Sequence, residues 1–230
     1  MASQASAPQA AIPSDHLMTV YKRAPVAFER GEGVRLFSTE GEAYLDCIAG
    51  IAVNALGHCH PKLVAAVEEQ ARKLWHVSNV YTIPQQEELA RKLCEVSFAD
   101  VCFFTNSGTE AVECAIKLAR KYHSSKGQPE RIDIIGFDGS FHGRTIGAIN
   151  AAGNPTYTDG FGPVPPGYVH LAFGDHEALK AAAAQPTAAA ILIEPVQGEG
   201  GARQVPDVCL RGLREPVSYT HLTLPTKRIV

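Results

Sequence analysis

One segment of the chain reads Thr105-Asn106-Ser107-Gly108-Thr109-Glu110-Ala111. It follows an apolar run from Val101 to Phe104, and the apolar residues after it recur with the spacing of an amphipathic helix from Ala111 to Tyr122. A strand, a short loop and a helix in this order form the repeating unit of parallel α/β sheets. The pattern therefore predicts a strand before this segment and the first turn of a helix within it.

The segment also has the composition of a phosphate-binding loop. The first N–H groups of a helix have no acceptor inside the helix and lie at the positive end of its dipole, so they favour an anion. Gly108 allows the backbone to approach a ligand closely, and Ser107 and Thr109 add hydroxyl donors. The alternative is an ordinary N-cap, with Glu110 favourable in the first turn. For this segment taken alone, the N-cap is the simpler interpretation.

Composition and charge exclude several classes of partner. The chain has 230 residues, 45% of them apolar and 20% charged, with a net charge of −3. This is a globular composition without the basic excess of proteins that bind nucleic acid or a membrane surface, and no uncharged apolar stretch is long enough to span a bilayer. The six cysteines are scattered without a Cys-x-x-Cys pair, so we expect reduced, buried thiols in a cytoplasmic protein. Residues 1–15 contain no Lys or Arg, unlike a signal or transit peptide, and we expect a disordered tail there.

Strand-like and helical patterns alternate along the rest of the chain. Short strands are expected between residues 26 and 46, helices over 61–74, 84–94, 111–122 and 177–184, and apolar strands over 101–104, 132–137, 168–172 and 188–193. Apolar strands without polar alternation, separated by helices, indicate a parallel sheet covered on both faces. Ligands of such sheets bind at the carboxyl ends of the strands. We therefore expect the loops 105–111, 139–144 and 194–201, each after a strand, to open on the same edge.

A second loop at this edge reads Phe141-His142-Gly143-Arg144-Thr145. Taken singly, Phe141 is more simply a core residue and Arg144 a solvated charge. Together with a phosphate-binding loop, an aromatic face and a guanidinium suit a flat phosphorylated cofactor and an acidic substrate.

The segment His58-Cys59-His60 carries potential metal ligands. A metal site needs three or four converging ligands, whereas adjacent residues of an extended segment point to opposite faces. The sequence offers no second cluster, so we expect a structural turn here and no metal.

Taken together, these segments resemble the class III pyridoxal-phosphate-dependent aminotransferases, which have fold type I, and within that class the acetylornithine group. The resemblance runs from about Tyr21 to Glu215 and rests on motifs in the family's order and spacing. The matching segments are Gly50-Ile51-Ala52-Val53-Asn54-Ala55-Leu56-Gly57-His58, His60-Pro61, Ser78-Asn79-Val80-Tyr81, Asn106-Ser107-Gly108-Thr109-Glu110-Ala111, Phe141-His142-Gly143-Arg144-Thr145, Phe161-Gly162-Pro163 and Glu194-Pro195-Val196-Gln197-Gly198-Glu199-Gly200-Gly201.

The resemblance implies an α/β fold, namely the three-layer large domain with a mainly parallel sheet, truncated in this chain. It implies a set of residues that bind pyridoxal 5'-phosphate: Ser107, Gly108, Thr109, Phe141, His142 and Glu194. In this set the Gly108 loop would hold the phosphate and Phe141 would stack on the pyridine ring. The implied substrate-binding residues are Arg144, which would bind the α-carboxylate, and Glu199.

The same resemblance implies a small-molecule amino donor and a 2-oxo acid as partners. The first choice is amino-group transfer between N2-acetyl-L-ornithine and 2-oxoglutarate in arginine biosynthesis, by a cytoplasmic enzyme that is a homodimer at full length. Other class III donors remain open, namely succinylornithine, succinyl-diaminopimelate, ornithine and 4-aminobutyrate. A non-catalytic product that binds a partner or phosphate is the alternative of a different class.

The family's chemistry also needs a Schiff-base lysine and an aspartate paired with the pyridine nitrogen. This chain has neither motif, and after Glu215 it departs from the family pattern. We therefore expect a fragment that is inactive as written. Its expected parts are residues 1–15 as a tail, 16–75 as the N-terminal segment of the aminotransferase, 76–215 as part of the cofactor-binding large domain, and 216–230 as a tail foreign to the family.

Overall fold

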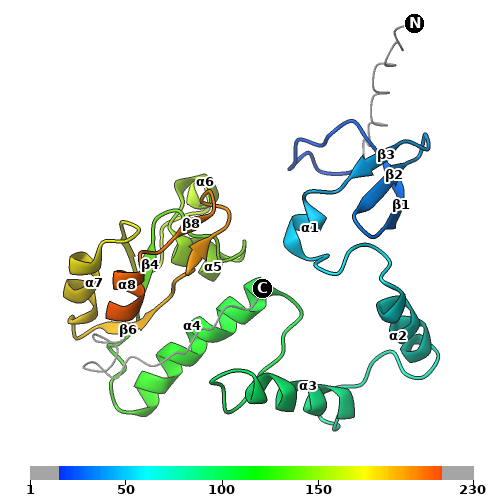
Figure 1. Cartoon of the computed structure of the whole chain (residues 1–230). Helices are drawn as coiled ribbons and strands as arrows, with labels where there is room; N and C mark the ends of the chain where they lie inside the picture. Colours follow the sequence, from blue (N-terminus) through cyan, green and yellow to red (C-terminus); the bar gives the residue numbers. More distant parts are fainter. Residues whose placement is uncertain (1–15, 214–230) are drawn as a thin grey trace, which may run out of the picture. The chain divides into compact units, whose positions relative to one another are not determined.

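A computed structural model describes residues 16–213, so the tails expected at 1–15 and 216–230 lie outside the described residues. The chain divides into two units at the Ile83–Pro84 boundary (Figure 1). We call residues 16–83 the amino-terminal unit and residues 84–213 the carboxy-terminal unit, and describe each by itself.

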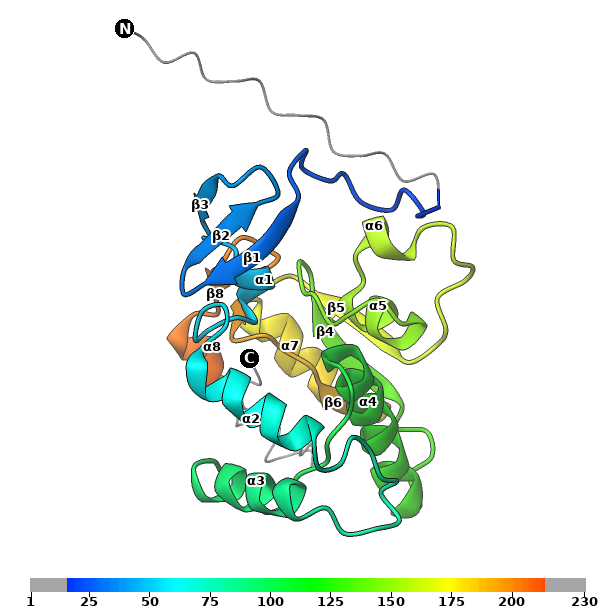
Figure 2. The same ribbon diagram turned by 90° about the vertical axis from the view of Figure 1, so that its right-hand side faces the viewer.

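The amino-terminal unit begins with an antiparallel meander, visible in blue in Figure 2. Its strands are β1 (Phe28–Glu32), β2 (Arg35–Ser38) and β3 (Ala43–Leu45), paired in the order β1-β2-β3. The strands predicted between residues 26 and 46 are thereby confirmed. The predicted helix after them is α2 (Pro61–Ala71), which starts with Pro61 in its first turn and ends before Leu74.

The short element α1 (Ala49–Ala52) is a left-handed turn. All of its residues have positive φ, namely Ala49 at 49°, Gly50 at 64°, Ile51 at 63° and Ala52 at 62°. This region is open to glycine at little cost but costs other residues roughly 1–2 kcal/mol each. The turn therefore stores backbone strain at the start of the Gly50–His58 segment.

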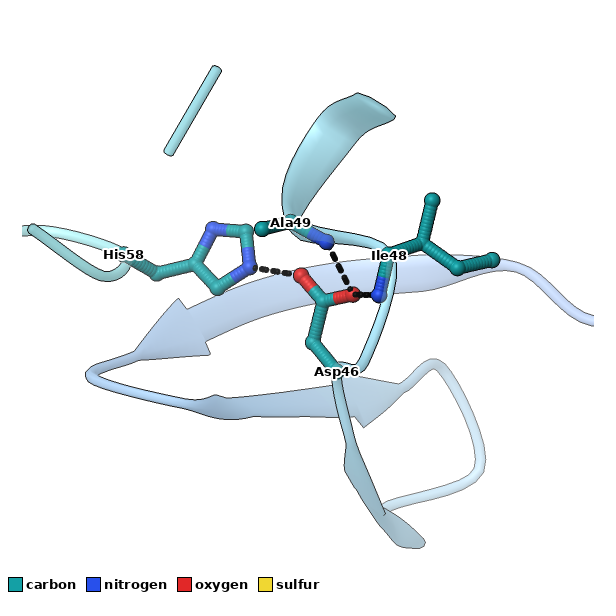
Figure 3. A network of polar contacts seen from close by, with 4 residues as sticks. All are labelled: Asp46, Ile48, Ala49 and His58. Carbon is teal, nitrogen blue, oxygen red and sulfur yellow. Dashed lines mark hydrogen bonds and ion pairs between the residues drawn. The ribbon is translucent and has the colours of Figure 1, made fainter. Parts of the chain in front are cut away.

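A polar network joins the two ends of that segment (Figure 3). Asp46 accepts hydrogen bonds from the backbone N–H groups of Ile48 at 3.0 Å and Ala49 at 2.8 Å, and from the His58 ring at 2.7 Å. The bond from His58, followed by those from the backbone, holds the pKa of Asp46 below its ordinary value. His58 therefore has a structural role in fastening the loop back onto the meander, where its backbone also pairs with Gly33.

The carboxy-terminal unit is built on a parallel sheet. Its strands are β4 (Asp133–Phe137), β5 (Tyr168–Leu171) and β6 (Ala188–Ile191), in the order β5-β4-β6. The central strand pairs with both neighbours in parallel, with Ile134 opposite Tyr168 and Ala190. This confirms the predicted parallel sheet. A separate antiparallel pair, β7 (Val196–Gln197) with β8 (Arg203–Gln204), follows β6.

Helices cover both faces of this sheet. On one face Ile134 packs in a cluster with residues of α4 (Gly108–Ser125) and α5 (Ile146–Ala152), and on the other Ile135 packs with residues of α7 (His176–Ala183). Neighbouring residues of a strand point to opposite faces, which is why Ile134 and Ile135 belong to different clusters. The layers are thus helix, sheet and helix, as expected for the large domain of fold type I.

The described residues also contain α3 (Pro84–Glu95), α6 (Pro155–Thr158) and α8 (Asp207–Gly212). Within residues 16–213, no helix has the length and apolar character needed to cross a membrane. The expectation that the cysteines are buried is wrong in part. Cys209 is buried, but Cys47 and Cys59 are exposed.

Three apolar parts of the described chain are more exposed than their patterns indicate. The run Val101–Phe104, expected as a strand, is not one, and Val101 is 84% exposed. Leu89 and Leu93, in the expected helix 84–94, are 49% and 39% exposed. Tyr122, in the expected helix 111–122, is 41% exposed. An apolar pattern indicates which residues share a face, but burial of that face requires an element packed against it.

Candidate active site

The segment 105–111 forms a capped helix N-terminus. Ser107, the N-cap of α4, accepts a hydrogen bond from the N–H of Glu110 at 3.4 Å and donates its own proton to the Glu110 carboxylate at 3.1 Å. Asn106 donates to the same carboxylate at 3.3 Å. The N-cap interpretation is therefore correct, and the cap occupies the Ser107 hydroxyl.

The cap leaves room for an anion. Within the described part of the chain, the backbone N–H groups of Gly108 and Thr109 have no acceptor. A Cβ added to Gly108 would meet no atom within 4 Å, and the φ of Gly108 lies outside the left-handed region. The protein's own conformation and packing therefore do not require a glycine here, which fits a backbone that a ligand approaches closely.

The loops after β4 and β6 are joined to each other. Glu194 accepts a hydrogen bond from the N–H of Phe141 at 2.9 Å. Gln197, which is fully buried, donates to the carbonyl of Asp138 at 3.0 Å and to the hydroxyl of Ser140 at 3.2 Å. These bonds fix the loop that carries Phe141 against the loop that carries Glu194.

The helix N-terminus of α4 also meets the Phe141 loop. The hydroxyls of Thr109 and Thr145 lie 3.1 Å apart. Gly143 has a φ of +112°, and a Cβ at this position would overlap the Thr109 side chain. The expected convergence of the three loops is therefore confirmed, although the first of them follows no strand.

Tyr157, in α6, connects the predicted site residues and was missed by the sequence analysis. Its ring lies edge-on to Phe141, with centroids 6.0 Å apart, and the Arg144 guanidinium lies 5.5 Å from its ring centroid. Its hydroxyl donates to Glu199 at 3.3 Å. The signal that could have identified it is its position just before the matching segment Phe161-Gly162-Pro163.

Burial alters the protonation of two predicted site residues. His142 is 8% exposed, its Nε2 has no partner among the described residues, and burial lowers its pKa from 6.5 to about 4. Burial, and then the nearby charge of Glu199, raise the pKa of Glu194, while the N–H of Phe141 opposes the shift. The site therefore contains a neutral imidazole and a carboxyl group that holds its proton more tightly than usual.

The family model for aminotransferase class III matches residues 18–221 of this sequence. The chain belongs to the class III aminotransferases. Acetylornithine aminotransferase 2 of Caulobacter vibrioides is 72% identical over 87% of this chain and 49% of that protein. Acetylornithine aminotransferase of Rhodobacter capsulatus is 59% identical over 86% of this chain and 50% of that protein.

Solved structures of aminotransferases have the same fold. Ornithine aminotransferase of Toxoplasma gondii superimposes with a TM-score of 0.85 at 30% identity, over 90% of this chain and 49% of that one. N-acetylornithine aminotransferase of Stenotrophomonas maltophilia gives 0.73 at 39% identity, over 86% and 49%. The chain thus spans about half the length of the relatives it matches.

Class III aminotransferases depend on pyridoxal phosphate, and the described residues fit this cofactor at two points. The open backbone at Gly108, with two unused N–H donors, suits a phosphate. Phe141, in the loop that contacts this N-terminus, is 37% exposed, so an aromatic side chain is accessible to a planar ligand here.

Proposed function

We propose that this chain forms the cofactor-binding half of an acetylornithine aminotransferase. The enzyme would use pyridoxal 5'-phosphate to move an amino group between N2-acetyl-L-ornithine and 2-oxoglutarate, as a cytoplasmic homodimer. The names and 72% and 59% identities of the bacterial relatives support this substrate. The structural observation that carries the proposal is the contact between the α4 N-terminus and the Phe141 loop at Thr109, Gly143 and Thr145.

That contact brings two parts of a cofactor site together. The N–H groups of Gly108 and Thr109 would hold the phosphate, and Phe141 would cover one face of the pyridine ring. Through its bond to the Phe141 N–H, Glu194 would fix the position of the Phe141 side chain relative to the pyridine ring. When bound, the cofactor accepts the amino group and delocalises the electrons left on the substrate Cα.

The substrate side of the site would be formed by Arg144 and Glu199, with Tyr157 between them. A guanidinium can bind a carboxylate through two parallel hydrogen bonds, which fixes both the position and the orientation of an amino acid. The Tyr157 ring supports Arg144 on one side, and its hydroxyl holds the Glu199 carboxylate. Ornithine is the second candidate donor, because the Toxoplasma gondii enzyme named for it has the same fold at 30% identity. Relative turnover of the two donors by the full-length enzyme separates these candidates.

Gly108→Ala tests the phosphate site. Alanine is a better helix former than glycine, so this change should stabilise the chain by up to about 1 kcal/mol. The same methyl group should obstruct the phosphate and weaken binding of 4'-deoxypyridoxine 5'-phosphate at least tenfold, roughly the loss of one hydrogen bond to a charged group. This probe lacks the aldehyde and cannot label stray lysines. Calorimetric titration measures the affinity and thermal unfolding the stability.

Two controls make the result decisive. The phosphate-free compound 4'-deoxypyridoxine should lose no affinity, because it does not reach Gly108. Equal affinity of the unchanged chain and Gly108→Ala for the phosphorylated probe would show that the α4 N-terminus is only a capped helix end, and the proposed cofactor site would be wrong.

A further inference from the structure

A chain of hydrogen bonds leads away from the proposed phosphate site. The Thr109 and Thr145 hydroxyls lie 3.1 Å apart, and Thr145 Oγ1 lies 2.5 Å from Glu113 Oε1. The same Glu113 oxygen accepts the backbone N–H of Gly147 at 3.0 Å. Glu113 lies one helical turn after Thr109 on α4, and Thr145 is the N-cap of α5. These hydrogen bonds therefore link α4, α5 and the loop between Phe141 and Thr145.

The direction of the protons in this chain follows from the groups involved. An ionised carboxylate only accepts hydrogen bonds, so Thr145 must donate its single proton to Glu113. Thr145 Oγ1 can then only accept from Thr109, and it also accepts the N–H of Ala148 at 3.4 Å. The Thr109 proton is consequently directed toward Thr145 and is not free for a ligand.

The other hydroxyl of the loop is occupied in the same way. Ser107 donates its proton to Glu110, as described above. Both hydroxyls of this loop thus donate within the protein, whereas the backbone N–H groups of Gly108 and Thr109 are available to an anion. The sequence analysis expected the two hydroxyls to be donors as well, and the bonds in the structure assign their protons elsewhere.

We propose that Glu113 is a positioning residue for the phosphate site. Through Thr145 and the Gly147 N–H it holds the start of α5, and with it the Phe141 loop, at a fixed distance from the backbone N–H groups that bind the anion. Thr145 at the same time directs the Thr109 proton away from the anion. The identity of the anion as the cofactor phosphate rests on the function proposed above. The hydrogen-bond direction does not depend on that function.

The test compares three variants of the 230-residue chain. Thr109→Val keeps the shape of the side chain and its backbone N–H but removes the hydroxyl, and its affinity for 4'-deoxypyridoxine 5'-phosphate should stay within about threefold of the unchanged chain. Glu113→Ala removes the acceptor of Thr145 and Gly147 and should weaken binding roughly tenfold. Glu113→Gln keeps an acceptor oxygen and should restore most of the affinity.

Several results would overturn the inference. A loss for Thr109→Val as large as that for Glu113→Ala would make the hydroxyl a phosphate donor. Glu113→Ala with unchanged affinity would remove the positioning role, and Glu113→Gln as weak as Glu113→Ala would leave only a charge effect. Should Glu113→Ala fail to fold, shown by thermal unfolding, Thr145→Val takes its place, because it removes the donor to Glu113. It should weaken binding to a similar degree, and unchanged affinity for Thr145→Val would overturn the inference.

A measurement without ligand separates this inference from the proposed function. The backbone N–H signals of Gly147 and Ala148 report directly on Glu113 and Thr145. In Glu113→Ala these amides should exchange their hydrogens faster, whereas in Glu113→Gln they should remain protected. If the unchanged chain binds no phosphorylated probe, the cofactor proposal fails, and these exchange rates alone confirm or overturn the role of Glu113.

Discussion

The two units of the chain are stabilised in different ways. In the carboxy-terminal unit Ile134, Ile135 and Leu179 are at most 2% exposed, on the two faces of one sheet. In residues 16–83, Ser38 is the only buried residue, while Trp75 is 88% exposed. Burial of apolar surface is the dominant favourable contribution to folding, so the carboxy-terminal unit contains its own core. The amino-terminal unit relies on the hydrogen bonds of its meander and on the Asp46 network.

This difference shows that the periodic spacing of apolar residues does not by itself predict that they are buried. The helix α2 has the spacing of an amphipathic helix, yet none of its residues is buried. The spacing specifies which side chains share a face, whereas the covering element has to come from elsewhere. No residue of α2 or α3 is buried, so neither apolar face is covered within its own unit.

The largest expected contrast is between two truncations of apolar side chains. Ile135→Ala should lower the free energy of unfolding by about 2–5 kcal/mol, because it leaves a cavity in the core. Val67→Ala, at a side chain that is 68% exposed in α2, should change it by less than about 0.5 kcal/mol. Urea unfolding followed by circular dichroism measures both. Similar losses for the two variants would mean that the amino-terminal unit has a core in solution, which would break the comparison.

Acid should destabilise the carboxy-terminal unit through His142. Its pKa is about 4 in the folded chain and 6.5 without burial, so the unfolded state binds the proton first as the pH falls. The contribution is fully present above pH 6.5 and is lost as the pH drops toward 4, by at most about 3 kcal/mol.

Unfolding free energies of the unchanged chain and of His142→Asn, at about pH 7 and about pH 4.5, measure this contribution. The variant should lose less stability on acidification than the unchanged chain. His76→Asn, at an exposed histidine of the amino-terminal unit, is the control and should lose as much as the unchanged chain. Equal acid sensitivity of all three chains would exclude His142 as the cause.

The smallest expected effect is at the left-handed turn of the amino-terminal unit. Ile51→Gly removes a steric cost of roughly 1–2 kcal/mol, against which glycine loses about 0.5–1 kcal/mol more chain entropy on folding. Because Ile51 is 85% exposed, no packing is lost, and the net result should be a gain of about 0.5–1 kcal/mol. Thermal unfolding tests this prediction, and the midpoint temperature of Ile51→Gly should be higher than that of the unchanged chain.

The control for this prediction is Ala66→Gly, at an exposed position in the right-handed helix α2. It should destabilise the chain by about 1 kcal/mol, opposite in sign to Ile51→Gly. A loss of stability in both variants would show that Ile51 does not have a positive φ in solution.

The sheet of the carboxy-terminal unit could be predicted because its strands are local, uninterrupted apolar runs between helices. β4, β5 and β6 lie inside the runs assigned from the sequence. The run Val101–Phe104 has the same apolar character but is not a strand. A strand forms only where a neighbouring strand pairs with it, and the residues of a run do not specify that neighbour. The left-handed turn at Ile51 could not be predicted either, because a β-branched residue disfavours that conformation.

Of the candidate site, the loops could be predicted, but several contacts between them could not. Arg120 of α4, for example, donates to the carbonyls of Ile132 and Gly167, both at 3.0 Å. Tyr157 and Glu113 act on predicted residues through contacts between chain segments far apart in sequence. Such contacts depend on the packing of α4, α5 and α6, which periodicity does not specify. The roles of the individual site residues remain predictions for the binding experiments above.

The strand order β5-β4-β6 has a consequence for the time course of folding. β4 is the central strand and ends at Phe137, yet both of its partners come later, and β6 ends at Ile191. At a synthesis rate of about 5–20 residues per second, β4 leaves the ribosome about 3–10 s before its last partner is complete. During that interval Ile134 and Ile135, which are at most 2% exposed in the finished strand, are part of a nascent chain with both edges of β4 unpaired. The interval is the period in which chaperones can bind this strand and in which neighbouring nascent chains can aggregate with it.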